Sequence, residues 1–235
     1  MDMEKFLLHQ FFNLKDFALA QVFEECQYAW CALARLEEFF AHVELGKIEC
    51  EIPKGAVLVD PEKISIGKGT IVEPGAFIRG PCVIGENCEV RHGAYIRGFV
   101  LAGNGCIIGN STEVKSSILL DGVCIAHFNY VGDSILGNRV NLGAGVKLAN
   151  LRLDNQTIQI SDAGQKISTN LKKLGAIIGD DAQFGCNAVT NPGTVVGKGV
   201  FCHPCMTIGG YIPPNAKVRS TQKMVIQDYV DRSCF

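Results

Sequence analysis

Three residues that could do chemistry stand close together in the stretch HFNYVGDSILGNRVN: His127, Tyr130 and Asn141. Histidine has an ordinary pKa of about 6.5, so its ring can take a proton from an attacking amine near neutral pH. Upstream, Arg97 and Lys115 could share a phosphate between a guanidinium and an ammonium group. The set suits acyl transfer from a thioester to an amine. A lone histidine or a lone pair of cations also fits an ordinary solvated surface.

A six-residue repeat must position these residues. From Ile66 onwards the first position of each hexad is Ile, Val, Leu or Ala, the fifth is mostly small or β-branched, and glycine recurs at positions two to four. This period is typical of a parallel β-helix, in which three hexads make one triangular coil of about 18 residues. Arg97 and Lys115 are separated by three hexads, which places them one coil apart on the same face. The repeat returns at Ile178, which predicts at least six coils.

The repeat shortens between Ala126 and Leu136, where HFNYV and GDSIL read as two five-residue steps. We expect a tightened corner there that exposes His127 and turns the backbone toward the thioester. The GAG that follows at 143–145 offers backbone N–H groups that can stabilise the oxyanion formed during transfer.

Three segments do not follow the repeat. Residues 1–46 carry apolar groups at spacings of three and four, as in FALAQVF and CALARLEEFF, which predicts two or three short amphipathic helices. We expect these helices to cap the open first coil, and a docking surface for another protein is the alternative. The β-helix then spans 47–219, with a polar inserted loop or short hairpin near 152–173, and 220–235 form a C-terminal tail.

Composition excludes several classes of protein. The 235 residues include 22 Lys and Arg against 24 Asp and Glu, with no long run of like charges, so neither nucleic acid nor membrane is expected as a partner. The acidic N-terminal stretch does not read as a secretory signal, and no segment approaches the roughly 18 to 20 apolar residues that span a bilayer. We expect a cytoplasmic protein.

The eleven cysteines are an odd number, which argues against a closed disulfide framework. Cys82, Cys88, Cys106 and Cys124 fall on the small fifth position, where cysteine can pack as a small hydrophobe. The stretch CHPC has metal-site spacing, but it is a single pair and Cys202 lies on a first position of the repeat. We therefore expect no metal site.

The stretch HFNYVGDSILGNRVNLGAG, with EVK at 113–115 before it and LGAIIGDD at 174–181 after it, resembles the acetyltransferase domain of the bifunctional enzymes that make UDP-N-acetylglucosamine. The resemblance covers about residues 50–219, and the pairing of H-x-x-Y-x-G-D with N-L-G-A-G is specific. The insert and the ANLR after GAG look more like the archaeal versions. The resemblance implies a mainly β protein, a left-handed parallel β-helix preceded here by the α-helical N-terminal cap.

The resemblance also implies roles for single residues. In the family pattern His127 is the base, Asn150 lies near the reacting amine, and Lys173 reaches the sugar site of a neighbouring subunit. The remaining residues would contact the sugar phosphate (Arg97, Lys115), the sugar (Tyr130, Asn141) and acetyl-CoA (Ala144, Cys186, Pro204, Arg219). Cys186 and Pro204 stand where the family usually has Ser and Ala, and Arg219 is close to the position of a nucleotide-contacting arginine. Two positions depart from the pattern: Leu151 replaces a tyrosine, and Thr221 stands where an arginine would contact the nucleotide of acetyl-CoA.

The function that the resemblance implies is N-acetylation of a hexosamine 1-phosphate, most simply glucosamine 1-phosphate. Acetyl-CoA is the donor, no metal is required, and a homotrimer is expected. The bifunctional relatives carry a nucleotidyltransferase domain before the β-helix, which we do not find here, so a separate nucleotidyltransferase could be a partner. Two alternatives stay open: an acyltransferase for another amino sugar or a nucleotide sugar, and a non-catalytic trimeric scaffold for such a partner.

Overall fold

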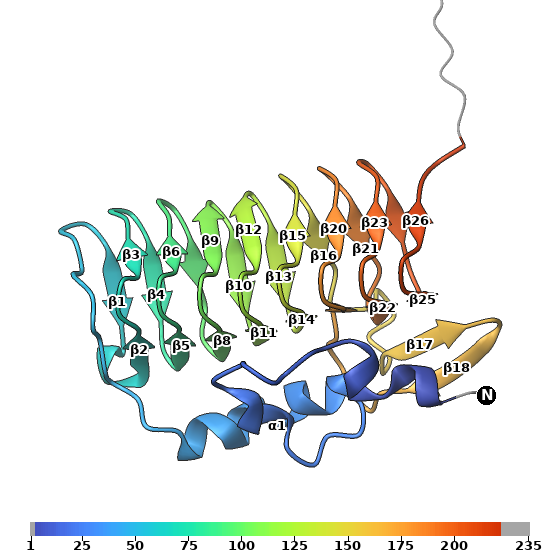
Figure 1. Cartoon of the computed structure of the whole chain (residues 1–235), viewed down its shortest axis with the longest axis horizontal. Coiled ribbons are helices and arrows are strands. Elements are labelled where there is room, and N and C mark those ends of the chain that lie inside the picture. The colour runs from blue at the N-terminus through green and yellow to red at the C-terminus, as the bar shows by residue number, and fades with distance from the viewer. Residues whose placement is uncertain (1–2, 222–235) are drawn as a thin grey trace, which may run out of the picture.

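The structure, a computed structural model, describes residues 3–221. It is a left-handed parallel β-helix, as expected, built as a three-sided prism with a helical segment along one side (Figure 1). Each side is an eight-stranded sheet in which every strand pairs in parallel with its neighbours one coil away. The chain passes from sheet 1 to sheet 2 to sheet 3 and back again in each coil.

The strands are short because each side of a coil needs only a few residues before the chain turns. Sheet 1 contains β1 (Val57–Val59), β4 (Phe77–Arg79), β7 (Tyr95–Ile96), β10 (Glu113–Lys115), β13 (Tyr130–Gly132), β16 (Lys147–Leu148), β21 (Val189–Thr190) and β24 (Thr207–Ile208). Sheet 2 contains β2 (Ile64–Ile66), β5 (Cys82–Ile84), β8 (Val100–Ala102), β11 (Ser117–Leu119), β14 (Ile135–Leu136), β19 (Ala176–Ile178), β22 (Thr194–Val196) and β25 (Tyr211–Ile212). Sheet 3 contains β3 (Ile71–Val72), β6 (Glu89–Val90), β9 (Ile107–Asn110), β12 (Cys124–His127), β15 (Asn141–Leu142), β20 (Gln183–Phe184), β23 (Phe201–Cys202) and β26 (Lys217–Val218).

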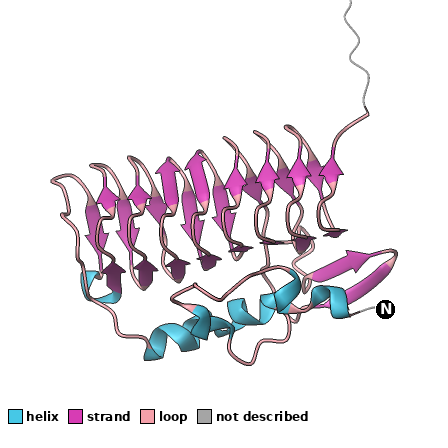
Figure 2. Cartoon of the chain, in the orientation of Figure 1, coloured by secondary structure: helices cyan, strands magenta, loops and turns pink. Residues whose placement is uncertain are grey.

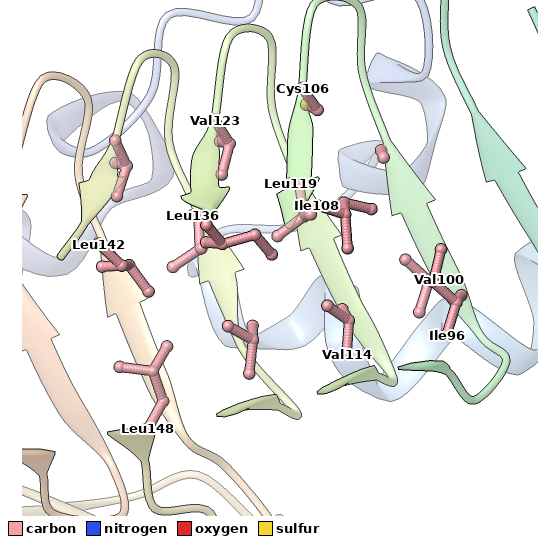
Figure 3. Close-up of a cluster of buried hydrophobic side chains, with 14 of the residues drawn as sticks. Ile96, Val100, Cys106, Ile108, Val114, Leu119, Val123, Leu136, Leu142 and Leu148 are labelled. Carbon is pink, nitrogen blue, oxygen red and sulfur yellow. The ribbon is translucent and has the colours of Figure 1, made fainter. Parts of the chain in front are cut away.

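The interior of the prism is filled by the aliphatic first positions of the repeat, several of which are labelled in Figure 3. Cys82, Cys88 and Cys106 are buried in this core, which confirms them as core residues, and Cys202 is buried there as well. Cys124 is different, because it lies half-buried on β12 while its neighbour Val123 fills the core. The expectation that Cys124 packs inside is wrong, because the repeat has already shifted by one residue before it.

The shift can be followed in the strand register. Phe77 pairs with Tyr95, which lies three full hexads further along the chain. Glu113 pairs instead with Tyr130, and Tyr130 with Lys147, so each of these two coils is one residue shorter. The buried core residues locate the two missing positions: one step runs from Val114 to Leu119 and the other from Val131 to Leu136.

Only the second of these short steps agrees with the sequence pattern. The step that contains His127 runs from Ile125 to Val131 and has its full six residues. The expectation that a tightened corner exposes His127 is therefore wrong. Both short steps lie instead at the turn from sheet 1 to sheet 2, which we call the Asp133 corner; Ser116 and Asp133 turn the chain there with φ values of 45° and 49°.

The N-terminal segment lies along sheet 2. It contains three short 3₁₀ helices (Glu4–Phe6, Leu8–Gln10 and Ala20–Phe23) and the α-helix α1 (Ala29–His42), and a further 3₁₀ turn (Pro61–Lys63) connects β1 with β2. In α1 the buried residues Ala29, Ala32, Leu36 and Phe40 recur every three or four positions, so one face packs on the prism.

This segment does not cover the first coil, so that expectation is wrong (Figure 2). The physical reason is that sheet 2 is apolar on its outer face as well as inside. Its outward residues Leu101, Ile118, Ile135, Ile177 and Val195 are all buried with the aromatic side chains of the N-terminal segment. A strand that is buried on both faces needs such a cover.

The insert, which we expected to protrude as a loop or short hairpin, forms an antiparallel hairpin of β17 (Gln159–Asp162) and β18 (Gln165–Ser168). Ala163 and Gly164 make its two-residue turn with positive φ, as such hairpins require. The hairpin is docked, because Ile158 and Ile160 are buried in the same cluster as the N-terminal segment, and Lys5 forms an ion pair with Asp162. Within residues 3–221, no helix is long and apolar enough to cross a bilayer.

Candidate active site

A polar cluster occupies the Asp133 corner. Lys115, the last residue of β10, donates from Nζ to Asp133 Oδ2 at 2.6 Å. Asn150, which follows β16 on the next coil, donates from Nδ2 to the same carboxylate oxygen. The side chains of Lys115 and Asp133 are only 15% and 14% exposed, so this pair is held in a fixed geometry at the surface of the prism.

Tyr130 completes the cluster from the first position of β13. Partial burial raises the pKa of its phenol, the carboxylates of Glu113 and Asp133 raise it further, and a hydrogen bond with the Asn150 amide opposes the increase. The phenol therefore stays protonated near neutral pH and can donate a hydrogen bond. Gly132 makes this packing fit, because a Cβ there would lie 2.8 Å from both the Tyr130 oxygen and Asn150 Nδ2.

Arg97 lies at the end of β7, one coil before Lys115, since Ile96 pairs with Val114. Its Nη1 donates to Glu113 Oε1 at 2.6 Å, and its guanidinium lies 5.7 Å from the centre of the Tyr95 ring. The two cations thus stand one above the other, as their three-hexad spacing predicts. Each also has a carboxylate partner, which the spacing does not reveal.

His127 ends β12 at the turn from sheet 3 to sheet 1, which we call the His127 corner. The ring is exposed, and no hydrogen bond of its side chain is found within residues 3–221. The three residues expected to contact acetyl-CoA at this corner stack above it on successive coils. The backbone links are Gly145 N–H to the His127 carbonyl at 3.0 Å, Asn187 N–H to the Ala144 carbonyl at 2.8 Å, and Cys205 N–H to the Cys186 carbonyl at 2.9 Å.

The GAG stretch at this corner offers one usable donor. The N–H groups of Gly143 and Gly145 already donate to the carbonyls of Phe184 and His127. The N–H of Ala144 has no partner in the described part of the chain. It stands one coil from His127 and is free to bind an oxygen atom.

An apolar groove of about 560 Å³ opens on sheet 3 next to this stack. Phe201 and Pro204 supply apolar surface, while His203 and Lys217 add basic groups, and Arg219 follows β26 beside them. The groove therefore combines an apolar wall with cations at the C-terminal end of the prism. This composition fits a long thiol ester that ends in phosphates.

The predicted residues form two groups rather than one. His127, Ala144, Cys186 and Pro204 line the His127 corner, with Asn141 beside them as the first residue of β15. Asn150 lies at the Asp133 corner, across sheet 1 from His127, so the two predicted catalytic residues are not in contact within one chain. Lys173 is exposed beside Asn150, because the next residue, Leu174, donates its N–H to the Asn150 carbonyl at 3.0 Å.

Sequence reasoning missed Glu113 and Asp133 as site residues. Both were visible: Glu113 is the first residue of EVK, and Asp133 closes H-x-x-Y-x-G-D at three hexads from Lys115. Cys202 and Cys205 do not converge, since Cys202 is buried in the core and Cys205 is exposed. Among the residues described, no group of three or more His, Cys, Asp or Glu could hold a metal ion.

Comparisons with known proteins find partial matches in sequence. The family model of the GMPPB C-terminal domain matches residues 78–168. A bifunctional sugar-1-phosphate nucleotidylyltransferase/acetyltransferase from Sulfurisphaera tokodaii is 39% identical over 84 residues, which are 36% of this chain and 21% of that protein. A bifunctional protein GlmU from Methanococcus maripaludis is 34% identical over 102 residues, 43% of this chain and 25% of that protein. The matched stretches span about a quarter of the length of these curated relatives.

Among solved structures, UDP-N-acetylglucosamine acyltransferase from Campylobacter jejuni superimposes with a TM-score of 0.51 at 16% identity, covering 70% of this chain and 69% of that chain. The likeness shows a shared fold, the left-handed parallel β-helix. In sequence, part of the chain is similar to the GlmU-type bifunctional proteins, as the resemblance in its motifs indicates.

Proposed function

We propose that this protein transfers an acetyl group from acetyl-CoA to the amine of a hexosamine 1-phosphate, most simply glucosamine 1-phosphate. The observation that carries the proposal is the stack at the His127 corner. It joins an exposed imidazole to a free backbone donor at Ala144 and to an apolar groove with basic residues at its far end. A polar cluster with two cations lies across sheet 1 from this stack.

The residues divide the chemistry between them. His127 removes a proton from the substrate amine, the nitrogen bonds to the thioester carbonyl carbon, and the carbon–sulfur bond breaks. The Ala144 N–H stabilises the negative charge that builds on the carbonyl oxygen. The proton held by His127 then passes to the departing thiolate, so the products are the amide and free thiol.

The polar cluster would hold the acceptor. Arg97 and Lys115 would bind the phosphate in place of their carboxylate partners, and Tyr130 would donate to a sugar hydroxyl. Asn141, which lies on sheet 3 beside the His127 corner, would donate to another. Asn150 would orient the sugar near the amine. Because His127 and Asn150 stand on opposite sides of sheet 1, we propose that a trimer closes the site, with Lys173 contributed by a neighbouring subunit. A separate nucleotidyltransferase partner stays a prediction.

The test is an acetylation assay on the purified full chain. Acetyl-CoA is combined with glucosamine, glucosamine 1-phosphate and UDP-glucosamine, and free thiol and N-acetyl product are measured together. We expect product with a phosphorylated acceptor and none with the free sugar. Absence of product with all three acceptors would contradict the proposal and favour the scaffold alternative.

A further inference from the structure

The cations of sheet 1 continue beyond the predicted phosphate pair. Arg79 ends β4, and the pairing of Ile78 with Ile96 places it one coil before Arg97. Arg79, Arg97 and Lys115 therefore form a ladder with a spacing of about 4.8 Å per coil. All three stand on the second outward position of their strands, at the edge near the Asp133 corner.

Arg79 differs from the other two cations of the ladder. Arg97 and Lys115 are paired with Glu113 and Asp133, but Arg79 is exposed and forms no ion pair within residues 3–221. Three cations face two carboxylates, so the ladder keeps one excess positive charge. An arginine that lacks a carboxylate is suited to a bidentate contact with a phosphate.

An aromatic pair runs beside the ladder on the same sheet. Phe77 and Tyr95 occupy the first outward position of their strands, with ring centres 5.3 Å apart in an edge-to-face arrangement. The Arg79 guanidinium lies 5.9 Å from the centre of the Phe77 ring. Aromatic rings next to cations are the combination that binds a nucleobase without reading its sequence.

The polar cluster and the cations occupy successive coils along the prism. Tyr130 and Asn150 stand where the sugar is proposed to bind, Lys115 and Arg97 where the first phosphate would bind, and Arg79 one coil further on. Adjacent phosphates joined by a shared oxygen can reach cations on neighbouring coils. Sheet 1 thus offers, in order, groups for the sugar, the first phosphate and the second phosphate, with the aromatic pair beside the coils of Arg97 and Arg79.

We propose that sheet 1 extends the acceptor site toward the first coils and binds the diphosphate and base of a nucleoside diphosphate amino sugar. Arg79 holds the second phosphate, and the Phe77–Tyr95 pair packs against the base. The inference rests on the proposed function for the position of the amine and of the first phosphate.

The experiment compares two acceptors, glucosamine 1-phosphate and UDP-glucosamine, in the wild-type chain and in Arg79→Ala. Loss of one charge-assisted contact should raise the ratio of the Michaelis constants, nucleotide sugar over sugar 1-phosphate, by about tenfold to a hundredfold. Arg97→Ala should raise both constants. Lys68→Ala removes an equally exposed cation on a different corner of the prism and should leave the ratio unchanged.

Calorimetric titration with UDP and with inorganic pyrophosphate separates the two halves of the subsite. Arg79→Ala should weaken binding of both probes, whereas Phe77→Ala should weaken UDP roughly tenfold and pyrophosphate little. If Phe77→Ala instead dissociates the oligomer in light scattering and leaves UDP binding intact, the aromatic pair is an interface between copies and its role in base binding is overturned.

The outcomes distinguish this inference from the proposed function. Transfer to glucosamine 1-phosphate with an unchanged ratio in Arg79→Ala overturns the inference and leaves the proposed function standing. If neither acceptor is acetylated by the wild type, the proposed function fails and the titrations decide alone. UDP binding that Arg79→Ala abolishes then supports the subsite, and absence of UDP binding to the wild type overturns it.

Discussion

The cations of the proposed phosphate site already form ion pairs within the protein. Arg97 and Lys115 each hold a carboxylate at 2.6 Å. A phosphate must therefore exchange with Glu113 and Asp133, and it gains only the difference between two charge-assisted contacts. Residue types and a three-hexad spacing could predict that the cations stack. They could not predict these partners, because a motif does not say which side chains meet.

Replacing His127 with alanine should separate chemistry from binding. The substitution removes the base and leaves both cations, so turnover should fall by about 10²- to 10⁴-fold with little change in the Michaelis constant for the acceptor. Steady-state kinetics checks this. His92→Ala is the matched control, because His92 is also exposed and lies two coils below His127 on the same corner. Near-normal turnover in the His127 variant would exclude it as the base.

Cysteine reactivity should report on the groove. Cys186 and Cys205 are exposed at the His127 corner, whereas burial raises the pKa of the Cys202 thiol to about 11 and that of Cys82 to about 12. Iodoacetamide reacts with the thiolate and not with the thiol. At pH 8 it should therefore modify the two exposed cysteines and spare the two buried ones.

Coenzyme A should slow the labelling of Cys186, as measured by peptide mass spectrometry. Cys31 is half-exposed in α1, away from the groove, and serves as an internal control whose labelling should not depend on coenzyme A. Equal labelling rates of Cys186 with and without coenzyme A would contradict its place in the cofactor groove.

At the scale of elements, all the irregularities of the repeat gather at the Asp133 corner. Two successive coils lose a residue there, and the next coil gains the insert that carries the hairpin. The sequence shows that the repeat is irregular, but its pattern assigns one short step to the wrong corner. The reason is that Leu119 and Leu120 are both apolar, and only the fold decides that Leu119 faces the core and Leu120 the N-terminal segment.

Restoring the missing residue should therefore damage the site and spare the fold. A glycine inserted between Gly132 and Asp133 returns the step to six residues, which the earlier coils accommodate at the same corner. The Asp133 carboxylate then moves away from Lys115 and Asn150, and a shift of about 1 Å at a catalytic site can cost roughly a hundredfold in rate.

We expect cooperative unfolding to persist, as measured by circular dichroism, together with a fall in turnover of that order. The matched control is a glycine inserted between Ala163 and Gly164, at the tip of the hairpin. Full activity in the corner variant would show that the short step has no part in the chemistry.

A second element, the N-terminal segment, is anchored near Asn13 by a buried carboxylate in addition to its apolar packing on sheet 2. Asp180 is 3% exposed, and its Oδ1 accepts from the backbone and the side chain of Asn138, while Oδ2 accepts from the backbone N–H of Asn13 at 2.8 Å. Asp180→Ala leaves these donors unpaired in a buried place. The variant should lose about 1–3 kcal/mol of unfolding free energy in urea titrations.

Limited proteolysis should also cleave within residues 3–43 of Asp180→Ala faster than in the wild type. Asp181→Ala is the control, because Asp181 is next to Asp180 in the sequence but its carboxylate pairs with Arg139 at the exposed surface. Equal stability of the two variants would contradict the anchoring role of Asp180.

For the whole molecule, the six-residue period was sufficient to predict the β-helix, because one face of every strand must be aliphatic. The position of the N-terminal segment beside sheet 2 was also predictable from the sequence, because strands of that sheet such as VLA and AII are continuous apolar runs. An alternating pattern would have marked an open face. What no local pattern gives is how sheet 1 and sheet 3 meet other copies.

If the site is divided across sheet 1 as proposed, activity should require an oligomer. We expect light scattering to report a trimer, and specific activity to fall when dilution dissociates it, because the groove between copies would unite His127 with a neighbour's Lys173. Mixing inactive His127→Ala and Lys173→Ala chains should restore part of the activity by complementation. A fully active monomer would exclude a shared site.

The N-terminal segment also connects the two ends of the β-helix. In a solenoid each coil contacts only the adjacent coils, so the end coils can unfold independently of the middle ones. Here Phe6 packs on Tyr211 of the last rungs, while Ile48 bridges Ile66 of the first, and the continuous chain between Phe6 and Ile48 ties the two ends together. Because this segment packs on the outer face of sheet 2, unfolding of either end should also disturb that packing. The first and last coils of the stack are thereby linked through one chain segment.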